Sequence, residues 1–260
     1  MTGTHGPVAL ITGGASGIGA AVANLWVQRG GRVAILDMNQ DAIDRVVAAF
    51  GKGSAGFKAD VTSAGEVDAA LTGVSDAFGG QLDAVVNCAG IARPIAAADG
   101  PDGEWARMVD IHLNGTMRVC RSAYSLLKSS DRAAIVNISS IAGAVGMSGR
   151  SSYSAAKAGI DGLTRALAVE WSPAVRVNAV APGFVTTPLS EEMIATGKVD
   201  PAPVIARTPL ARYGTTAEIA SAVNFLASPE ASFVTGQILR VDGGITIAGN
   251  WYASNKPGSD

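Results

Sequence analysis

The sequence is poor in the residues that form cross-links and metal sites. Its 260 residues include only two cysteines and two histidines. Cys88 and Cys120 match neither a disulfide framework nor a paired metal motif, so we expect reduced thiols packed as small apolar groups. His5 lies near the start of the chain, and His112 has no second ligand at metal-binding spacing. We therefore expect no bound metal.

Charged residues and long apolar runs are scarce as well. The 20 basic and 22 acidic residues give a formal net charge of −2, and they form no cluster of Lys or Arg that would neutralise a phosphate backbone. No apolar run approaches the roughly 20 residues that span a bilayer. Residues 1–7 lack the basic and then apolar order of a secretory signal. We expect a cytoplasmic protein that contacts neither nucleic acid nor membrane.

What the sequence does contain is a large apolar fraction, 48 %, which is enough for a substantial core in one domain. Short β-rich segments alternate with helical patterns, and several, such as residues 8–11, are apolar on both faces, as expected for strands covered by helices on two sides. This alternation predicts a single α/β domain of Rossmann type with a doubly wound, seven-stranded parallel sheet. The expected strands are Val8 to Thr12, Arg32 to Asp37, Gly56 to Asp60, Leu82 to Cys88, Ala133 to Ser139, Val175 to Val180 and Ile238 to Val241. We expect residues 1–7 and 250–260 to be flexible tails.

A glycine-rich loop follows the first expected strand and opens a helix expected over Ala20 to Gln28. Glycines there let the backbone approach a pyrophosphate, whose charge is met by the N–H groups at the helix N-terminus. A glycine-rich turn without a ligand is the alternative, but the strand, turn and helix context favours a nucleotide. The expected cofactor contacts in this loop are Gly13, Ser16, Gly17, Ile18 and Gly19.

The second expected strand ends in Asp37, which points to the choice of cofactor. A carboxylate at this position accepts hydrogen bonds from the ribose hydroxyls of NAD and repels the 2′-phosphate of NADP. The alternative is a solvent-facing aspartate in the turn that continues with Met38. Because no Arg or Lys lies in the glycine loop, we expect NAD, with Asp37 and Met38 among its contacts.

Tyr153 and Lys157 are the candidates for proton chemistry. They lie four residues apart at the start of a helix expected to run to about Glu170, so they share one helical face. An ammonium beside a phenol lowers the phenol's pKa from about 10, which would let the tyrosine exchange protons near neutral pH. Alone, such a pair is equally well explained as two surface residues. Ser140, however, follows the fifth expected strand and would face the same crevice at the carboxyl edge of the sheet.

Together these segments give the chain a specific resemblance. From Val8 to Gly244 it resembles the short-chain dehydrogenase/reductase family in its common form of about 250 residues. The resemblance rests on the glycine loop, Asp60-Val61, Asn87-Cys88-Ala89-Gly90, Asn114, Ser140, Tyr153-x-x-x-Lys157 and Pro182-Gly183-x-x-x-Thr187. Cys88 departs from the family, which usually has a second asparagine there. We expect this change to affect local hydrogen bonding rather than chemistry, and a reactive thiol is the sharper alternative.

The resemblance implies a role for each matching residue. Tyr153 would be the acid/base, Ser140 would bond the substrate oxygen, Lys157 would hold the nicotinamide ribose, and Asn114 would hold a water that links Lys157 to solvent. Asp60 and Val61 would contact adenine. The remaining residues expected along the cofactor are Asn87, Ala89, Gly90, Pro182, Gly183, Val185 and Thr187.

The sequence therefore predicts an NAD-dependent enzyme that interconverts a secondary alcohol and a ketone. Two alternatives share the same residues: an NADP-dependent reductase of carrier-bound 3-oxoacyl chains, and a catalytically silent NAD-binding sensor. The expected pocket walls are Ile91 to Asp99, Ile141 to Arg150 and Phe184 to Tyr213, which suggest a partly apolar small molecule. Arg93 or Arg150 would suit an anionic group, but solvation at the surface is the simpler interpretation. By resemblance we expect a homo-oligomer, a dimer or tetramer, paired through helices near residues 103–127 and 152–170.

Overall fold

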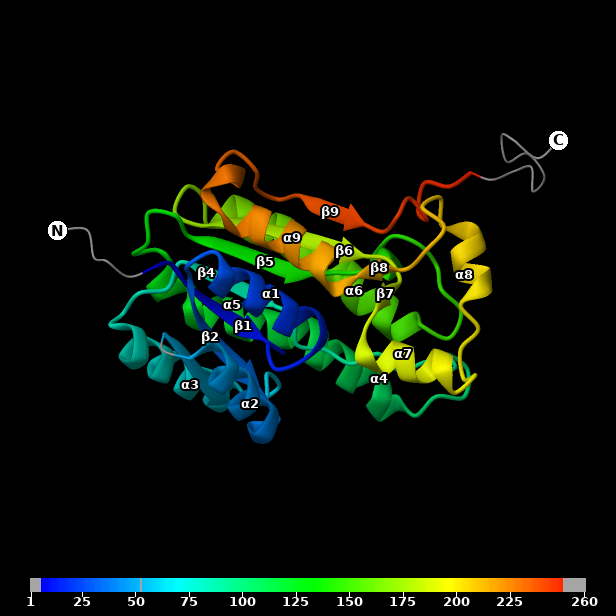
Figure 1. The fold of residues 1–260 in the computed structure, drawn as a ribbon, viewed down its shortest axis with the longest axis horizontal. Coiled ribbons are helices and arrows are strands. Elements are labelled where there is room, and N and C mark those ends of the chain that lie inside the picture. Colours follow the sequence, from blue (N-terminus) through cyan, green and yellow to red (C-terminus); the bar gives the residue numbers. More distant parts are fainter. Residues whose placement is uncertain (1–5, 52, 250–260) are drawn as a thin grey trace.

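A computed structural model describes residues 6–51 and 53–249 of the chain. Its centre is one parallel sheet of seven strands in the order β3-β2-β1-β4-β5-β6-β9, which confirms the predicted doubly wound α/β fold (Figure 1). The strands are β1 (Val8–Thr12), β2 (Arg32–Asp37), β3 (Ser54–Lys58), β4 (Ala84–Asn87), β5 (Ala134–Ile138), β6 (Arg176–Pro182) and β9 (Ile238–Val241).

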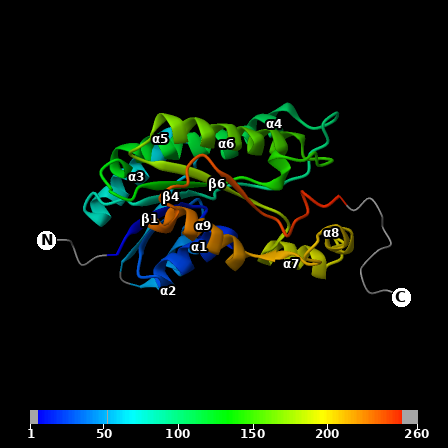
Figure 2. The same cartoon turned by 90° about the horizontal axis from the view of Figure 1, so that it is seen from above.

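Helices cover both faces of this sheet, as Figure 2 shows from above. One layer holds α3 (Ala64–Phe78), α4 (Asp102–Val109), α5 (Gly115–Leu127) and α6 (Ser151–Glu170), and the other holds α1 (Gly17–Gln28), α2 (Gln40–Phe50) and α9 (Thr216–Ala227). Beyond the carboxyl ends of the strands lie α7 (Pro188–Ala195), α8 (Ala202–Arg207) and a small sheet of β7 (Val185–Thr186) and β8 (Gly214–Thr215). The sequence did not predict this small sheet.

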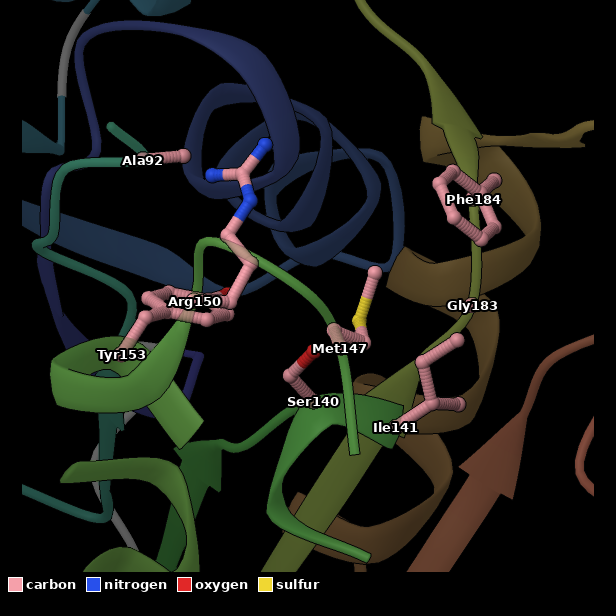
Figure 3. Close-up of a pocket in the computed structure, with 8 residues that line it drawn as sticks. All are labelled: Ala92, Ser140, Ile141, Met147, Arg150, Tyr153, Gly183 and Phe184. Atoms are coloured by element: carbon pink, nitrogen blue, oxygen red, sulfur yellow. The ribbon is translucent and has the colours of Figure 1, made fainter. Parts of the chain in front are cut away.

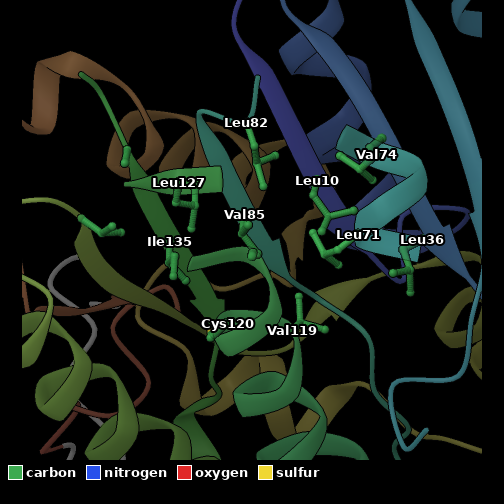
Figure 4. Close-up of a cluster of buried hydrophobic side chains, with 14 of the residues drawn as sticks. Leu10, Leu36, Leu71, Val74, Leu82, Val85, Val119, Cys120, Leu127 and Ile135 are labelled. Carbon is green, nitrogen blue, oxygen red and sulfur yellow. The ribbon is translucent and has the colours of Figure 1, made fainter. Parts of the chain in front are cut away.

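The strand residues alternate between two apolar cores, one on each face. Leu10 and Val85 pack with side chains of α3 and α5 such as Val119 (Figure 4), whereas their neighbours Ile11 and Val86 pack toward α1 and α9. Successive side chains of a strand point to opposite faces, so a strand that is buried on both sides must be apolar throughout. This explains the unbroken apolar runs of β1 and β4.

The third strand differs from its prediction by two residues at each end. It runs from Ser54 to Lys58 and not from Gly56 to Asp60. Asp60 instead belongs to the turn before α3, where its backbone N–H donates to Glu66 Oε2 at 2.9 Å. Because β3 is the edge strand and is only partly buried, it lacks the apolar run that marked the other strands.

The strand order reverses beside β1, and the site forms there. The chain leaves β1 and β4 toward opposite faces, which opens a crevice at their carboxyl ends. Thr12, at the end of β1, ties the two strands together, because its Oγ1 accepts the backbone N–H groups of Cys88 and Ala89, both at 3.1 Å. The glycine loop and the residues after β4 therefore face each other across this crevice.

Pro7, at the end of the N-terminal tail expected over residues 1–7, is held by hydrogen bonds. The Pro7 carbonyl accepts hydrogen bonds from Trp26 Nε1 at 3.1 Å and from the backbone N–H of Arg32 at 2.8 Å. The rest of that tail, residues 1–5, and the tail expected over 250–260 lie outside the described residues. In the part of the chain that is described, no helix combines the length and apolar character needed to cross a membrane.

Candidate active site

A cleft of about 1100 Å³ opens at the carboxyl ends of β1, β2 and β4. Gly13 lines the cleft just after β1 and has a φ of +62°, which favours glycine. A Cβ at this position would lie 2.9 Å from Ala89 Cα, so only glycine fits between the ends of β1 and β4. Gly17 has φ of +51° with no atom within 4 Å of its Cβ position, which leaves open space above the first turn of α1. The first N–H groups of a helix have no partner within the helix, so this turn could hold a phosphate.

Most of the predicted cofactor contacts line this cleft. They are Gly13, Ser16, Gly17, Ile18, Asp37, Met38, Asp60, Val61, Ala89, Gly90, Tyr153, Lys157 and Thr187, and the predicted catalytic residue Asn114 lines the cleft as well. The helix α1 begins at Gly17, three residues earlier than the predicted Ala20, so Gly17 and Ile18 belong to its first turn.

Five predicted cofactor contacts do not line the cleft: Gly19, Asn87, Pro182, Gly183 and Val185. Asn87 is buried, and its Nδ2 donates to Asn137 Oδ1 at 2.9 Å and lies 3.2 Å from Cys120 Sγ, so it stabilises the join between β4 and β5. A Cβ on Gly19 would lie 2.3 Å from Gly13 O, so this glycine permits close packing within the loop. Pro182 is buried at the end of β6, and Val185 lies in β7.

Asp37 is held at the end of β2 by backbone donors. Its Oδ2 accepts the N–H of Ala15, in the glycine loop, at 3.2 Å, and its Oδ1 accepts the N–H of Asn39 at 3.2 Å. The carboxylate is therefore fixed beside the loop and partly exposed to the cleft. The next residue, Met38, is 61 % exposed and uncharged. The end of β2, which would meet a substituent on the ribose, therefore carries the negative charge of Asp37 with no cationic residue beside it in the sequence.

Tyr153 and Lys157 lie together at the start of α6, as their spacing predicted. Lys157 Nζ is 5.5 Å from the centre of the Tyr153 ring and donates to the carbonyl of Ile138, at the end of β5, at 2.7 Å. The lysine is 4 % exposed, and burial lowers the pKa of its ammonium to about 8, against the opposing effect of Cys88 and Asp161. Ser140 follows β5, and its hydroxyl interacts with the Tyr153 phenol.

The prediction that the pKa of Tyr153 is lowered is wrong, because the surrounding protein raises it. Burial raises this pKa above its usual value, and the interaction with Ser140 and the positive charge of Arg150 oppose the rise only in part. The ammonium of Lys157 lies over the ring face and is bonded to Ile138. Desolvation disfavours the phenolate, and sequence spacing alone does not reveal that cost.

Asn114, predicted to hold a water that links Lys157 to solvent, lines the cleft together with Lys157. Asn114 is exposed, and its Nδ2 donates to Asp110 Oδ1 at 3.0 Å, one turn back. His112 also contacts Tyr153, and the two rings meet edge to face with their centres 5.3 Å apart. His112 and Asn114 lie in a π-helical turn, Asp110–Asn114, and residues two apart on a helix face different ways.

His112 is held tightly in this position. It is 3 % exposed, and its Nε2 lies 2.8 Å from the carbonyl oxygen and 3.2 Å from the amide nitrogen of Ile91, so it can bond to this residue in either tautomer. Burial and the charge of Lys157 lower its pKa to about 3, which keeps the ring neutral. Its Nδ1 is buried without a hydrogen-bond partner among the described residues. The signal available in the sequence was a polar residue between two apolar ones, Ile111 and Leu113.

We expect substitution of His112 to reduce turnover far more than substitution of Asn114. The substitution His112→Ala removes the imidazole that contacts both the Tyr153 ring and the Ile91 backbone. The phenol is then less well positioned, and a misplaced reacting group costs roughly 100-fold in rate. Asn114→Ala removes a hydrogen bond to Asp110 and a polar group at the cleft, but it leaves the contact between His112 and the Tyr153 ring in place. Steady-state kinetics of the two variants with the same alcohol would test this, with thermal melting as a check on folding. Equal losses in two equally folded variants would contradict the assignment of His112.

Cys88 is the departure from the family pattern, and it lies at the cleft. It is half-buried and lines the cleft just after β4. Burial raises the pKa of its thiol to about 11, with the charge of Lys157 opposing the rise. A thiol with such a high pKa stays protonated at neutral pH, which argues against the reactive-thiol alternative.

A second, smaller pocket of about 130 Å³ is lined by Ser140 and Tyr153 among others (Figure 3). Tyr153 lines both cavities and so stands where they meet. The lining residues of the small pocket are Ala92, Ser140, Ile141, Met147, Arg150, Tyr153, Gly183 and Phe184. This places the predicted Ser140 and Gly183 beside the small pocket. No group of three or more His, Cys, Asp or Glu side chains within residues 6–51 and 53–249 is arranged to hold a metal ion.

Comparisons with known proteins agree with this architecture. The family model described as enoyl-(acyl carrier protein) reductase matches residues 13–246. The chain is 44 % identical, over 92 % of its length and 96 % of the relative, to cis-4-hydroxycyclohexanecarboxylate dehydrogenase of Sinomonas cyclohexanicum. It is 36 % identical, over 93 % of its length and 98 % of the relative, to the 3-oxoacyl-[acyl-carrier-protein] reductase FabG of Vibrio cholerae.

Among solved structures, a short-chain dehydrogenase/reductase of Brucella melitensis superposes with a TM-score of 0.87 at 35 % identity, covering 93 % of this chain and 97 % of that one. The glycine loop, the Tyr153–Lys157 pair and the strand order thus occur in a chain that matches such proteins over nearly its whole length. The chain belongs to the short-chain dehydrogenase/reductase family of oxidoreductases.

Proposed function

We propose that this chain is an NAD(H)-dependent dehydrogenase that interconverts a secondary alcohol and a ketone. The observation that carries the proposal is the position of Tyr153, which lines both the large cleft and the small pocket. A phenol at that junction can exchange a proton with the oxygen of a molecule in the small pocket, beside a cofactor in the cleft.

The residues of the cleft fit a dinucleotide. The first turn of α1 and the open space above Gly17 would hold the pyrophosphate, and Asp37 would bind the adenosine ribose. Asp60 and Val61 would lie beside the adenine, and Lys157 would hold the nicotinamide ribose. When bound, NAD supplies the hydride acceptor for alcohol oxidation.

The chain's own residues handle the proton. In alcohol oxidation the Tyr153 phenolate accepts the hydroxyl proton, while the Ser140 hydroxyl bonds to the same oxygen. Ketone reduction follows the reverse path, with the phenol as donor. Because burial raises the pKa of Tyr153, formation of the phenolate depends on the interaction with Ser140 and on the positive charge of Arg150, which both oppose the rise. His112, packed on the ring, would position the phenol.

A second function is favoured by one comparison. The match to a 3-oxoacyl-[acyl-carrier-protein] reductase supports a reductase of carrier-bound chains that uses NADP. Against it stands Asp37, whose fixed carboxylate would face the 2′-phosphate. The match to a hydroxycyclohexanecarboxylate dehydrogenase supports an alcohol substrate with an apolar body. A silent NAD-binding sensor would have no need for Ser140 and Tyr153 at the small pocket with Lys157 beside the tyrosine ring.

A panel of alcohols offered with NAD and with NADP tests the proposal. The panel holds isopropanol, cyclohexanol, β-hydroxybutyrate, the hydroxycyclohexanecarboxylate of the relative and a β-hydroxybutyryl carrier thioester, and the reduced nicotinamide is followed by its absorbance. We expect at least one free alcohol to be oxidised with NAD. Turnover of the thioester alone, with NADP, would favour the carrier reductase, and binding of NADH without any turnover would favour the sensor.

A further inference from the structure

We propose that Arg150 binds an anionic group of the substrate, so that the enzyme acts on secondary alcohols or ketones that carry a carboxylate. The inference rests on the proposed function and names the substrate class of the same site. Arg150 lines the small pocket, its guanidinium has no counter-ion among the described residues, and its backbone is held by hydrogen bonds.

Arg150 lies in the wall of the small pocket. It is the residue just before α6, three positions before Tyr153, and it lines the pocket together with Tyr153 and Ser140. Figure 3 shows its side chain passing the Tyr153 ring, with the guanidinium directed toward Ala92. A molecule whose hydroxyl meets Tyr153 and Ser140 would therefore have the guanidinium beside the rest of its body.

The guanidinium of Arg150 lacks a partner within the described ranges: no carboxylate lies within salt-bridge distance and none of its N–H groups donates a hydrogen bond. Two other arginines near the cleft are paired, Arg107 with Glu104 at 3.8 Å and Arg118 with Asp110 at 2.7 Å. Arg150 is only partly exposed, and its pocket neighbours include Ile141, Met147 and Phe184. A cation between apolar walls and without a counter-ion favours the binding of an anion, which it can contact through two N–H groups.

The backbone around Arg150 is fixed, so the guanidinium has a defined origin. The Arg150 N–H donates to the carbonyl of Met147 at 3.2 Å, and its carbonyl accepts the N–H of Ser154, in the first turn of α6, at 2.7 Å. The preceding Gly149 turns the chain with φ of +68°, and its carbonyl accepts the N–H of Ile95 at 2.8 Å. A charged group anchored in this way needs little reorganisation to bind a ligand.

The structure also separates the two arginines that the sequence left open. Arg93 is exposed and does not line the small pocket, whereas Arg150 does. The remaining pocket wall is mostly apolar. These features together fit a substrate with three parts: a hydroxyl or keto group at Tyr153, a short apolar body, and a carboxylate at Arg150.

The test compares a hydroxycarboxylate of the panel with its neutral methyl ester in the wild type, Arg150→Gln, Arg150→Lys and, as the matched control, Arg93→Gln. Arg150→Gln removes the charged hydrogen bond to the carboxylate. We expect this loss to lower the ratio of kcat/KM for the carboxylate to kcat/KM for the ester about 30-fold, mainly through a higher KM for the carboxylate. We expect Arg150→Lys to retain part of the ratio and Arg93→Gln to retain all of it. An unchanged ratio in Arg150→Gln, or a wild type that prefers the ester, would overturn the inference.

Failure of the inference and failure of the proposed function give different results. If neutral alcohols are oxidised with NAD and Arg150→Gln leaves the carboxylate-to-ester ratio unchanged, the proposed function stands and the role of Arg150 fails. If no alcohol is oxidised, calorimetric titration of benzoate and benzamide into the NADH-bound wild type and Arg150→Gln decides the question. Tighter binding of benzoate that is lost in the variant supports the anion site, and equal binding of the two probes excludes it.

Discussion

Tyr153→Phe is expected to lower turnover by roughly 1000-fold while leaving the affinity for NADH nearly unchanged. The substitution removes one oxygen at the junction of the cleft and the small pocket. The ring remains, so its contacts with His112 and with the Lys157 ammonium are preserved. Steady-state turnover and NADH fluorescence titration, measured on the same preparation, separate the loss of chemistry from a loss of cofactor binding.

Tyr124→Phe is the matched control for this experiment. Tyr124 lies in α5, where its ring packs on Trp171 with the ring centres 4.7 Å apart, and it lines neither cavity. We expect this variant to turn over like the wild type. A Tyr153→Phe enzyme that keeps most of its activity would mean that another group exchanges the proton, and the assignment of Tyr153 would fail.

Asp37→Ser is expected to weaken the preference for NAD over NADP by roughly 100-fold in the ratio of kcat/KM. In the wild type the carboxylate is fixed by the N–H groups of Ala15 and Asn39, so it cannot turn away from a second negative charge. The variant removes that repulsion together with a strong acceptor for ribose hydroxyls. Adding Met38→Arg, at the exposed neighbouring position, should raise NADP use further, because it supplies a cation for the phosphate.

Asp41→Asn is the control, since Asp41 is an exposed carboxylate in the first turn of α2. Kinetics with both cofactors on all variants give the ratios directly. A wild type that prefers NADP, or an Asp37→Ser variant with an unchanged ratio, would contradict the proposed cofactor and favour the carrier reductase.

The parts of the site that are local in sequence could be predicted from it. The glycine loop between β1 and α1 and the spacing of Tyr153 and Lys157 each depend on one strand, turn or helix, and the structure has them where they were expected. The strands buried on both faces were likewise found from their apolar runs. The partly exposed edge strand β3 gave a weaker pattern, and its position was wrong by two residues.

Features that depend on distant segments were not predictable in the same way. The π-helical turn Asp110–Asn114 inserts an extra residue per turn, so a pattern read with the usual helical period does not show that His112 faces Tyr153. The interaction of Asn87 with Asn137 joins residues from two strands. The raised pKa of Tyr153 is a further example, because it reflects burial by the whole fold.

The most direct test of the account follows one hydrogen atom. The best alcohol of the panel, deuterated at the carbon that bears the hydroxyl group, is oxidised by the wild type with NAD, and the reduced cofactor is isolated for mass spectrometry. Hydride transfer predicts that the deuterium is found on the nicotinamide ring, in equal amount to the ketone formed. Ketone formed without label on the cofactor, or no oxidation of any alcohol, would contradict the claim that this chain is a dehydrogenase of secondary alcohols.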